Sequence, residues 1–289
     1  MRAIETDKKT LGHLTINYLT LQGFSCEFQQ LRLGSFLEIF MMSSQASQLR
    51  NRPSYPGLFI TFEGPEGSGK TTQCRHLADW LETHGQSVLI TREPGGTPMA
   101  EAIRNLLLTK QASTRKQETM TPACEAALVL AARSQHVTHT IVPALQKGII
   151  VLCDRFFDST LAYQGFGRGL NRQALIRFND FATGGIRPTL TFLLDLPVKE
   201  GLRRRKRASN QNRMDQESLA FHERVRRGFV TLARQDARRW RKLDAQKSPE
   251  ELAEEIIRHI KPVVLKPTSP KRKMASNTLQ GTKPKRPGS

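Results

Sequence analysis

The pattern of apolar and polar residues along the chain changes at Gly57. Before it, residues 11–42 mix apolar and polar side chains without a sustained period, so this stretch predicts neither an amphipathic helix nor a strand. From Gly57 onward, short apolar runs rich in β-branched and aromatic residues alternate with longer stretches of helical periodicity. The runs that predict strands are residues 58–62, 87–91, 148–153, 190–196 and 240–244.

The stretches that predict helices lie between and after these strands. They are residues 71–84, 100–108, 123–146, 171–182, a helix that starts near Pro197, and residues 219–237 and 249–260. Strands that alternate with helices are typical of a parallel sheet whose two faces are both covered, and wholly apolar runs fit strands buried on both faces. We therefore predict an α/β fold with a five-stranded parallel sheet and helices on both faces. Several arginines and a lysine crowd the fifth strand, 240–244.

Positive charge is concentrated in two stretches of the chain. The formal net charge is +19, of which residues 201–247 supply +10 and residues 262–289 supply +7. A basic balance suits polyanionic ligands, whether nucleotides or nucleic acids, and does not choose between them.

Cysteine usage and hydropathy indicate the cellular compartment of the protein. The four cysteines are widely spaced and form no CxxC pair, which indicates free thiols in a reducing compartment and argues against a disulfide or zinc framework. No run of 18 apolar residues occurs, so no membrane span is predicted. We expect a cytoplasmic protein without a membrane partner.

Three segments are expected along the chain. Residues 1–56 form an N-terminal extension without the features of a secretory signal or a transit peptide. Either they are disordered or they lie upstream of the true translation start, near Met41 and Met42, and a targeting arm is the third alternative. Residues 57–261 form the domain that holds every motif described below. Residues 262–289 are rich in Pro, Lys and Ser, so we expect a basic disordered tail.

A glycine-rich loop follows the first predicted strand and opens the first predicted helix. Residues 64–71 fit the pattern GxxxxGK[ST], in which backbone N–H groups and a helix N-terminus surround phosphate oxygens. We expect Lys70 to reach the β- and γ-phosphates and Thr71 to bind Mg²⁺. The predicted ATP-binding residues are Gly64, Pro65, Glu66, Gly67, Ser68, Gly69, Lys70, Thr71 and Thr72. An accidental match is the alternative, but the strand–loop–helix context argues against it and favours a fold of the P-loop NTPase type.

Two charged pairs directly follow predicted strands and therefore lie at the carboxyl edge of the sheet, where open α/β sheets bind ligands. Arg92-Glu93 follows the second strand, and the alternative for it is a solvated surface pair. Asp154-Arg155 follows the third strand. There Asp154 could hold Mg²⁺ through water, and Arg155 could neutralise a moving phosphoryl group. The alternative for this second pair is a structural ion pair.

Five blocks of sequence occur in an order and spacing typical of one enzyme family. They are residues 62–72, the TREPGGT run at 91–97, AAR at 131–133, the DR and AYQG blocks within 154–165, and Arg187-Pro188. In these blocks the chain resembles the thymidylate kinases of bacterial type, a branch of the P-loop nucleoside monophosphate kinases. The resemblance covers about residues 57–261. It implies phosphorylation of dTMP to dTDP with ATP and Mg²⁺, for dTTP synthesis, by a homodimer.

The resemblance also implies roles around the acceptor phosphate. Arg155 would clamp the donor and acceptor phosphates, and Asp154 would join Thr71 at the metal. Arg92 and Glu93 belong to a turn that lines the acceptor phosphate pocket in the family. Arg104 matches a family arginine that contacts the dTMP phosphate, and its alternative is a helix-surface arginine.

Four residues would hold the nucleoside of the acceptor. The resemblance implies that Arg133 and Gln164 hydrogen-bond the thymine base, and a glutamine amide can both donate and accept. Tyr163 would crowd the 2′ position of the sugar, and Glu66 would accept from its 3′-hydroxyl. Arg133 lies within an apolar helical run, so the alternative for it is a side chain that snorkels to water; for Glu66 the alternative is a side chain that points to solvent.

Residues 201–215 are expected to form a mobile lid that brings an arginine to the transferring phosphoryl group. In the bacterial branch the lid supplies this arginine because the phosphate loop has none, and this loop also has none before Lys70. The predicted catalytic residues are Lys70, Arg155 and Arg204, and Arg207 and Arg213 are the next candidates in the lid. The alternatives are a solvated basic helix and an RNA-binding patch.

Three positions depart from the family pattern. Asn212 and Thr189 stand where Asp is frequent, and Val129 stands where bacterial relatives carry a Phe that stacks on thymine. Two other functions also stay open. One is a kinase of another nucleoside monophosphate, and the other is a basic nucleic-acid-binding P-loop protein. The tail has no aromatic residue, so its contact with nucleic acid would be nonspecific and salt-sensitive.

Overall fold

Five parallel strands form one sheet in the order β2-β3-β1-β4-β5. The computed structural model describes residues 54–109, 119–207 and 211–265. The strands are β1 (Phe59–Glu63), β2 (Val88–Arg92), β3 (Ile150–Asp154), β4 (Leu190–Asp195) and β5 (Trp240–Asp244). The predicted five-stranded parallel sheet is confirmed.

The edge strand β5 forms despite the charges that surround it. It pairs with β4 from Thr191 opposite Trp240 to Asp195 opposite Asp244. Trp240 and Leu243 are buried, and Lys242 forms an ion pair with Asp195 at 3.0 Å. Apolar burial on the strand and a neutralised lysine therefore outweigh the unfavourable composition.

The helices begin mostly at side-chain caps and prolines. Thr97, Thr121 and Ser248 accept hydrogen bonds from the first turns of α3, α4 and α10, and each precedes a proline at the start of the helix, which are favoured N-terminal arrangements. The helices are α2 (Lys70–Thr83), α3 (Pro98–Leu108), α4 (Pro122–His136), the π-helical η1 (Val137–Ile141), α5 (Val142–Gln146), α6 (Phe157–Thr160), the π-helical η2 (Leu161–Gly167), α7 (Arg172–Thr183), α8 (Val198–Lys206), the 3₁₀ turn η3 (Arg213–Gln216), α9 (Leu219–Gln235) and α10 (Pro249–Val264).

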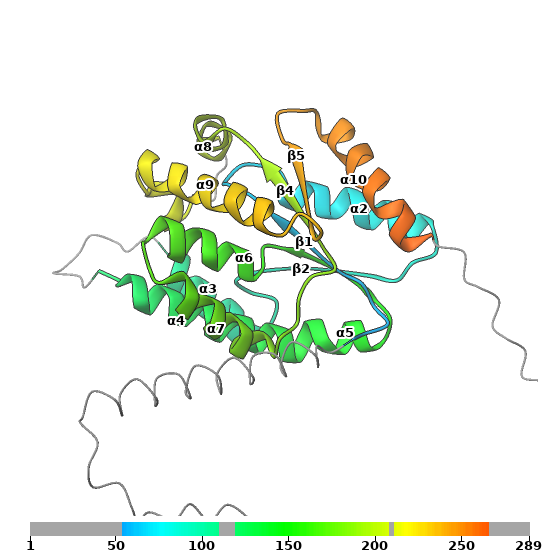
Figure 1. The fold of residues 1–289 in the computed structure, drawn as a ribbon, viewed down its shortest axis with the longest axis horizontal. Coiled ribbons are helices and arrows are strands. Elements are labelled where there is room, and N and C mark those ends of the chain that lie inside the picture. Colours follow the sequence, from blue (N-terminus) through cyan, green and yellow to red (C-terminus); the bar gives the residue numbers. More distant parts are fainter. Residues whose placement is uncertain (1–53, 110–118, 208–210, 266–289) are drawn as a thin grey trace, which may run out of the picture. The chain divides into compact units, whose positions relative to one another are not determined.

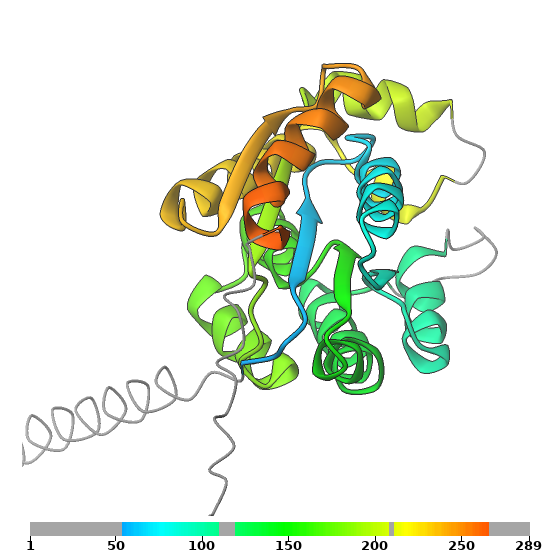
Figure 2. The ribbon, with the colours of Figure 1, turned by 90° about the vertical axis from the view of Figure 1, so that its right-hand side faces the viewer.

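Two apolar layers cover the sheet, one on each face. Successive residues of a strand point to opposite faces, so Ile60 and Phe62 pack into the layer that α2 and α10 cover, whereas Phe59 packs into the layer of α4, α5 and α7. Figure 1 shows the two groups of helices on opposite sides of the strands, and Figure 2 shows the same arrangement from the side. The predicted coverage of both faces is confirmed.

The structure differs from the predicted elements in a few places. The helical segments α6 and η2, which directly follow β3, were not expected from the sequence pattern. Helix α10 continues to Val264, slightly beyond the predicted domain boundary at 261. Residues 1–53 and 266–289, which include nearly all of the expected extension and tail, lie outside the described residues. Within the described part of the chain, no helix combines the length and hydropathy that a membrane crossing requires.

Candidate active site

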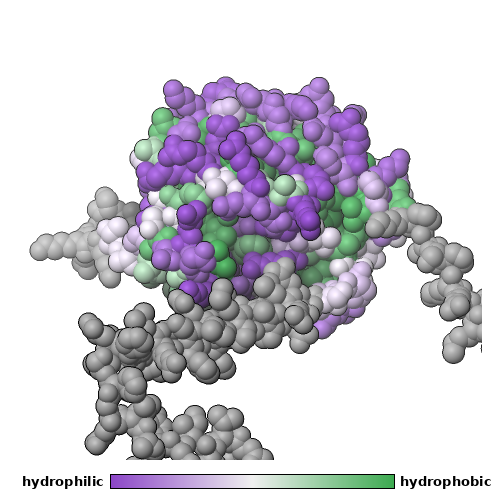
Figure 3. Space-filling model, in the orientation of Figure 1, coloured by the Kyte–Doolittle hydropathy of each residue, from purple (hydrophilic) through white to green (hydrophobic). Residues whose placement is uncertain are grey.

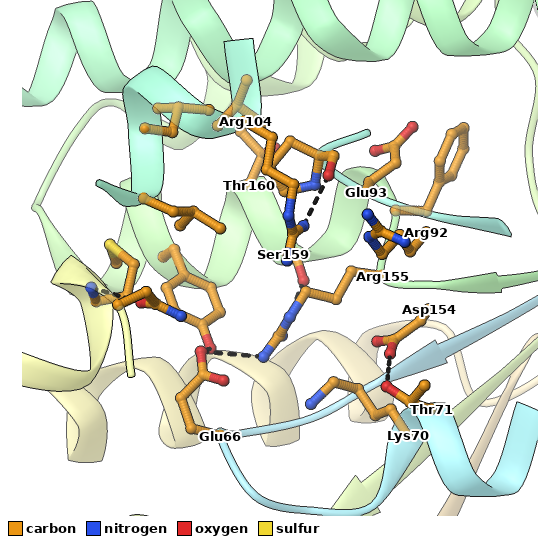
Figure 4. Close-up of a pocket in the computed structure, with 18 of the residues that line it drawn as sticks. Glu66, Lys70, Thr71, Arg92, Glu93, Arg104, Asp154, Arg155, Ser159 and Thr160 are labelled. Atoms are coloured by element: carbon orange, nitrogen blue, oxygen red, sulfur yellow. Dashed lines mark hydrogen bonds and ion pairs between the residues drawn. The ribbon is translucent and has the colours of Figure 1, made fainter. Parts of the chain in front are cut away.

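A pocket of about 410 Å³ lies at the carboxyl edge of the sheet, beside the ends of β2 and β3 and the loop that follows β1. Figure 4 shows side chains from these elements pointing toward one another across it. The pocket brings together the predicted residues Glu66, Gly67, Ser68, Gly69, Lys70, Thr71, Thr72, Arg92, Glu93, Arg104, Arg133, Asp154, Arg155, Tyr163 and Gln164. Among the described residues that were predicted for the site, Gly64, Pro65 and Arg204 do not line it, and neither does the further lid candidate Arg207.

The phosphate loop holds Lys70 at the base of the pocket. Its ammonium group donates to the carbonyl oxygens of Gly64 at 3.2 Å and Pro65 at 2.8 Å. Burial, together with the nearby positive charge of Arg155, lowers the pKa of Lys70 to about 8. Gly67 has φ of +70°, and a Cβ there would lie 2.3 Å from a backbone oxygen of α8. Only glycine fits this position, because the loop and α8 meet backbone to backbone.

Thr71 and Asp154 meet at the mouth of the loop. The Thr71 hydroxyl donates to Asp154 Oδ2 at 2.5 Å, and Figure 4 shows both side chains beside Lys70. Mg²⁺ prefers oxygen ligands and is commonly held by one or two carboxylates together with substrate phosphates. No cluster of three or more acidic, His or Cys side chains is found in the described ranges, and such a cluster is not needed. A hydroxyl and a carboxylate in contact therefore fit a Mg²⁺ that is shared with nucleotide phosphates.

Arg155, Glu66 and Tyr163 form a partly buried charged group on the opposite wall. Arg155 Nη2 lies 3.1 Å from Glu66 Oε1, and the Tyr163 hydroxyl donates to the same oxygen at 2.7 Å. Burial alone would raise the pKa of Glu66, but the charges of Arg155 and Lys70 and the Tyr163 hydroxyl outweigh it and lower the pKa to about 2. The anion inside the phosphate loop is thus compensated within the pocket and does not simply point to solvent.

The segment that carries Arg155 is anchored by Glu63, a residue to which the sequence analysis gave no role. The backbone of Arg155 has φ of +70°, and Arg155 is the only non-glycine residue with positive φ in the described ranges. The Glu63 carboxylate accepts from Phe156 N at 2.8 Å and from the Ser159 hydroxyl at 2.6 Å, which anchors the segment just after Arg155. Burial and the nearby Asp158 raise the pKa of Glu63 to about 7. The sequence does contain a signal for this role, since Glu63 is an acidic residue at the end of a mostly apolar strand, next to the phosphate loop.

Arg133 and Glu93 form a buried ion pair beneath the turn after β2. Arg133 Nε donates to Glu93 Oε2 at 2.7 Å, and the two side chains are 1% and 3% exposed. Arg133 therefore does not snorkel to water. Glu93 also contacts His136 Nδ1 at 3.1 Å, while Arg92 pairs with Glu101 instead. The alternative in which Arg92 and Glu93 form a solvated surface pair is wrong.

The turn itself is fixed from the side of α3. The Glu93–Pro94 peptide bond is cis, and Arg104 Nη1 donates to the Pro94 carbonyl oxygen at 2.7 Å. Burial and the charge of Arg92 lower the pKa of Arg104. Arg104 is thus a half-buried pocket residue that supports the turn, rather than a residue of the helix surface.

Comparison with known proteins identifies the family of the chain. The family model described as thymidylate kinase matches residues 62–256, the range that holds every residue of the pocket. The chain belongs to the thymidylate kinase family. It is 53% identical over 199 residues to the thymidylate kinase of Thermomicrobium roseum, which covers 68% of this chain and 91% of that protein. It is 49% identical over 203 residues to the thymidylate kinase of Geobacter sulfurreducens, with 68% and 93% covered.

The fold resembles a solved member of the thymidylate kinase family. The crystal structure of thymidylate kinase from Ehrlichia chaffeensis matches with a TM-score of 0.56 and 33% sequence identity, over 71% of this chain and 98% of that chain. The pocket described above is therefore the candidate active site of a thymidylate kinase domain.

Two arginines from residues 201–215, the range predicted as a lid, line the pocket. Figure 3 shows hydrophilic side chains gathered over the part of the surface where Figure 1 places α8 and α9. Arg205 lines the pocket and pairs with Asp215 at 2.6 Å. Arg213 also lines the pocket and pairs with Glu125 at 2.7 Å.

Arg204, the predicted catalytic arginine of the lid, occupies a different place. It pairs with Glu200 on the same helix at 2.8 Å and donates to the Ala245 carbonyl oxygen at 3.2 Å. Its role in phosphoryl transfer stays a prediction, and the arrangement favours Arg205 and Arg213 over it. Helical spacing could not decide this, because neighbouring positions on α8 face different sides.

Proposed function

We propose that this protein transfers the γ-phosphoryl group of ATP to dTMP, giving ADP and dTDP for dTTP synthesis. The single observation that carries the proposal is one pocket, within a thymidylate kinase domain, that joins a phosphate loop to a second cationic group. Arg92 and Arg104 lie on one side of it and Lys70 on the other, with Arg155 between them in Figure 4. Two anionic nucleotides can be held end to end in such a pocket.

Positioning and charge neutralisation are enough for this reaction. The acceptor is a phosphate oxygen that is already anionic at neutral pH, so no general base is needed. Lys70 and Arg155 would stabilise the charge that spreads over the transferring group. Arg205 and Arg213 would close the pocket from the lid side and help to exclude water, which limits the wasteful transfer of the phosphoryl group to water.

Mg²⁺ is the proposed cofactor, with Thr71 and Asp154 as the residues that would hold it. When bound, the ion would neutralise charge on the β- and γ-phosphates. The 2.5 Å contact between the Thr71 hydroxyl and Asp154 supports this proposal. Activity should disappear with EDTA and return with excess Mg²⁺, and activity that persists in EDTA would contradict it.

The test of the function is a coupled ADP-release assay of the full chain with ATP and a panel of dTMP, dUMP, dCMP and dGMP. We expect dTMP to give the highest kcat/KM. The matched control is Lys70→Ala, which leaves the backbone of the loop unaltered and should release no ADP above background. A higher kcat/KM for another monophosphate would replace dTMP as the substrate, and no ADP release with any of them would refute the kinase.

We further propose a homodimer with α4 and α7 in the interface. Phe178 and Phe181 of α7 are 57% and 87% exposed, and they flank an apolar groove with Ala127, Leu130 and Ala131 of α4. A contiguous apolar patch of this kind marks protein–protein contact. Light scattering should give the mass of a dimer for the wild type and of a monomer for Phe181→Glu, and a monomeric wild type would contradict the proposal.

We propose the cytoplasm as the location of the protein. The described cysteines, Cys74, Cys124 and Cys153, are free thiols, as is typical of a reducing compartment. Fractionation of cells that express the full chain tests this, and recovery in a membrane or organelle fraction would contradict it.

A further inference from the structure

Gln164, one of the residues expected to read the base, has one end of its amide held by Glu125. Gln164 lies in η2 and is buried. Its Nε2 donates to Glu125 Oε1 at 2.8 Å. Glu125 lies in the first turn of α4, and its side chain is 3% exposed. Both residues line the pocket, so the contact joins two walls of the candidate active site.

Glu125 is ionised in this setting. Arg168 donates to both of its oxygens, from Nε to Oε1 at 3.2 Å and from Nη2 to Oε2 at 2.9 Å. Arg213 Nη2 donates to Oε2 at 2.7 Å. Burial would raise the pKa of Glu125, but its hydrogen bonds with Arg168, Gln164 and Arg213 outweigh burial and lower it. An ionised carboxylate can only accept hydrogen bonds.

The charge of Glu125 therefore decides which way the Gln164 amide points. Only its NH₂ group can face the carboxylate, so its carbonyl oxygen Oε1 must face away. Oε1 of Gln164 accepts no hydrogen bond from the described part of the chain. Among the described residues, it is also absent from the fully buried polar atoms that lack a partner, so it is accessible from outside the protein core. Since Gln164 lines the pocket, the group it presents there is a lone acceptor.

Arg133 supplies the complementary group. Its Nε donates to Glu93, its Nη1 to Thr160 and Asn179, and its Nη2 to the Phe156 carbonyl oxygen. A guanidinium has five N–H bonds, so these contacts leave one Nη2 hydrogen without an acceptor among the residues described. Arg133 and Gln164 together thus offer the pocket one donor and one acceptor, both fixed by buried partners. Thymine and uracil present O4 as an acceptor and N3–H as a donor, whereas cytosine presents a donor amino group and an acceptor N3.

We propose that Glu125 is a positioning residue that sets pyrimidine specificity: it fixes Gln164 with Oε1 toward the base, so that a base with N3–H is preferred over cytosine. The inference deepens and rests on the proposed function. Glu125 acts through Gln164 and needs no contact with the substrate. A site built this way selects partly by leaving the polar groups of the wrong base unpaired.

The substitution Glu125→Gln should reverse the amide of Gln164. The new side chain has one NH₂ group, which must replace either Oε1 or Oε2. At Oε2 it would face the Nη2 groups of Arg168 and Arg213, at 2.9 and 2.7 Å. At Oε1 it would face only the longer contact of 3.2 Å from Arg168 Nε, and Gln164 can turn to accept from it. The turned Gln164 then presents NH₂ to the base, which suits cytosine N3.

The experiment measures kcat/KM of the full chain for dTMP, dCMP and dUMP. In Glu125→Gln, the preference for dTMP over dCMP is expected to fall about tenfold or more, which corresponds to about 1.4 kcal/mol. The preference for dTMP over dUMP should change less than about twofold, because both bases present the same edge and an amide reversal affects them equally. General loosening of the pocket would instead lower both preferences.

Two further single variants and one double variant separate positioning from structural support. Glu217→Gln removes another carboxylate partner of Arg168, at 2.6 Å, without touching Gln164, and should keep the wild-type preference over dCMP. Glu125→Asp stays an acceptor only, and should keep that preference better than Glu125→Gln even where its stability is lower. In a Gln164→Leu background, Glu125→Gln should change the preference less than about twofold, since contacting residues that act together are not additive.

Different outcomes would overturn the positioning role of Glu125 and the proposed phosphorylation of dTMP on which it rests. A wild type without ADP release on dTMP would overturn both. An active wild type, with a dTMP-over-dCMP preference that Glu125→Gln leaves within about twofold, would overturn the role of Glu125 alone. Should Glu125→Gln fail to fold in thermal melts, Gln164→Leu decides: an unchanged preference over dCMP in that variant would also overturn the inference.

Discussion

The buried pair of Glu93 and Arg133 gives the most quantitative prediction for stability. The substitution Glu93→Gln keeps the shape of the side chain but removes its charge. One carbonyl oxygen would have to serve both Arg133, now at 2.7 Å, and His136, now at 3.1 Å. Removing one partner of a buried ion pair costs about 3–5 kcal/mol, because the other charge stays buried. Since the new amide keeps one acceptor, we expect a loss of about 3 kcal/mol in the free energy of unfolding.

Urea unfolding followed by circular dichroism measures this loss. With a slope near 3 kcal/mol per molar urea, the midpoint should fall by roughly 1 M. The matched control is Glu101→Gln in the same region, where the partner Arg92 is 53% exposed. An exposed pair contributes at most about 1 kcal/mol, so the control midpoint should move far less. Equal shifts in the two variants would refute the reasoning.

The pH dependence of the difference gives a second check. Burial would raise the pKa of Glu93, but Arg133 and His136 outweigh it and lower the pKa from its ordinary value of 4.5. A carboxylate with a lowered pKa contributes stability above the pKa of the unfolded chain, and this contribution is lost as the pH falls through the folded pKa. The gap between wild type and Glu93→Gln should thus be constant near neutral pH and narrow only below about pH 4.5. A gap that does not change with pH would mean that charge is not its cause.

The remaining predictions concern activity. Lys70→Ala should abolish phosphoryl transfer while circular dichroism stays that of the wild type, and turnover by the folded variant would refute the phosphate-loop assignment. Arg205→Ala should lower kcat by about tenfold or more, and more than Arg204→Ala does, because only Arg205 lines the pocket; the reverse order in single-turnover rates would restore Arg204 as the lid arginine. Val129→Phe should tighten dTMP binding by roughly 3–10-fold in calorimetry, since a ring beside thymine adds stacking; weaker binding by the folded variant would mean that Val129 does not face the base.

The local sequence determined the sheet and the phosphate loop. Apolar runs with strand propensity alternate with helical periods, and each glycine of the loop is needed where it stands because a side chain would collide or strain the backbone. The carboxyl ends of parallel strands meet at one edge, so the placement of Arg92 and Asp154 at the same edge as the loop followed from the parallel arrangement of the strands. The sheet, the loop and this shared edge could be predicted because they depend on short-range sequence patterns and on the rule that parallel strands end at the same edge.

Only the tertiary structure decided the partners of the buried charges. Glu125 and His136 lie outside the motifs, and Glu63 lies in one without an assigned role, yet they anchor Gln164, Glu93 and the segment just after Arg155. Which lid arginine enters the pocket also depended on the tertiary contacts of α8, where Arg204 turns to Glu200 and Arg205 to Asp215. The physical reason is that a buried charge takes its partner from whatever packs against it. For this protein such a partner can lie 96 residues away in sequence, as with Glu63 and Ser159.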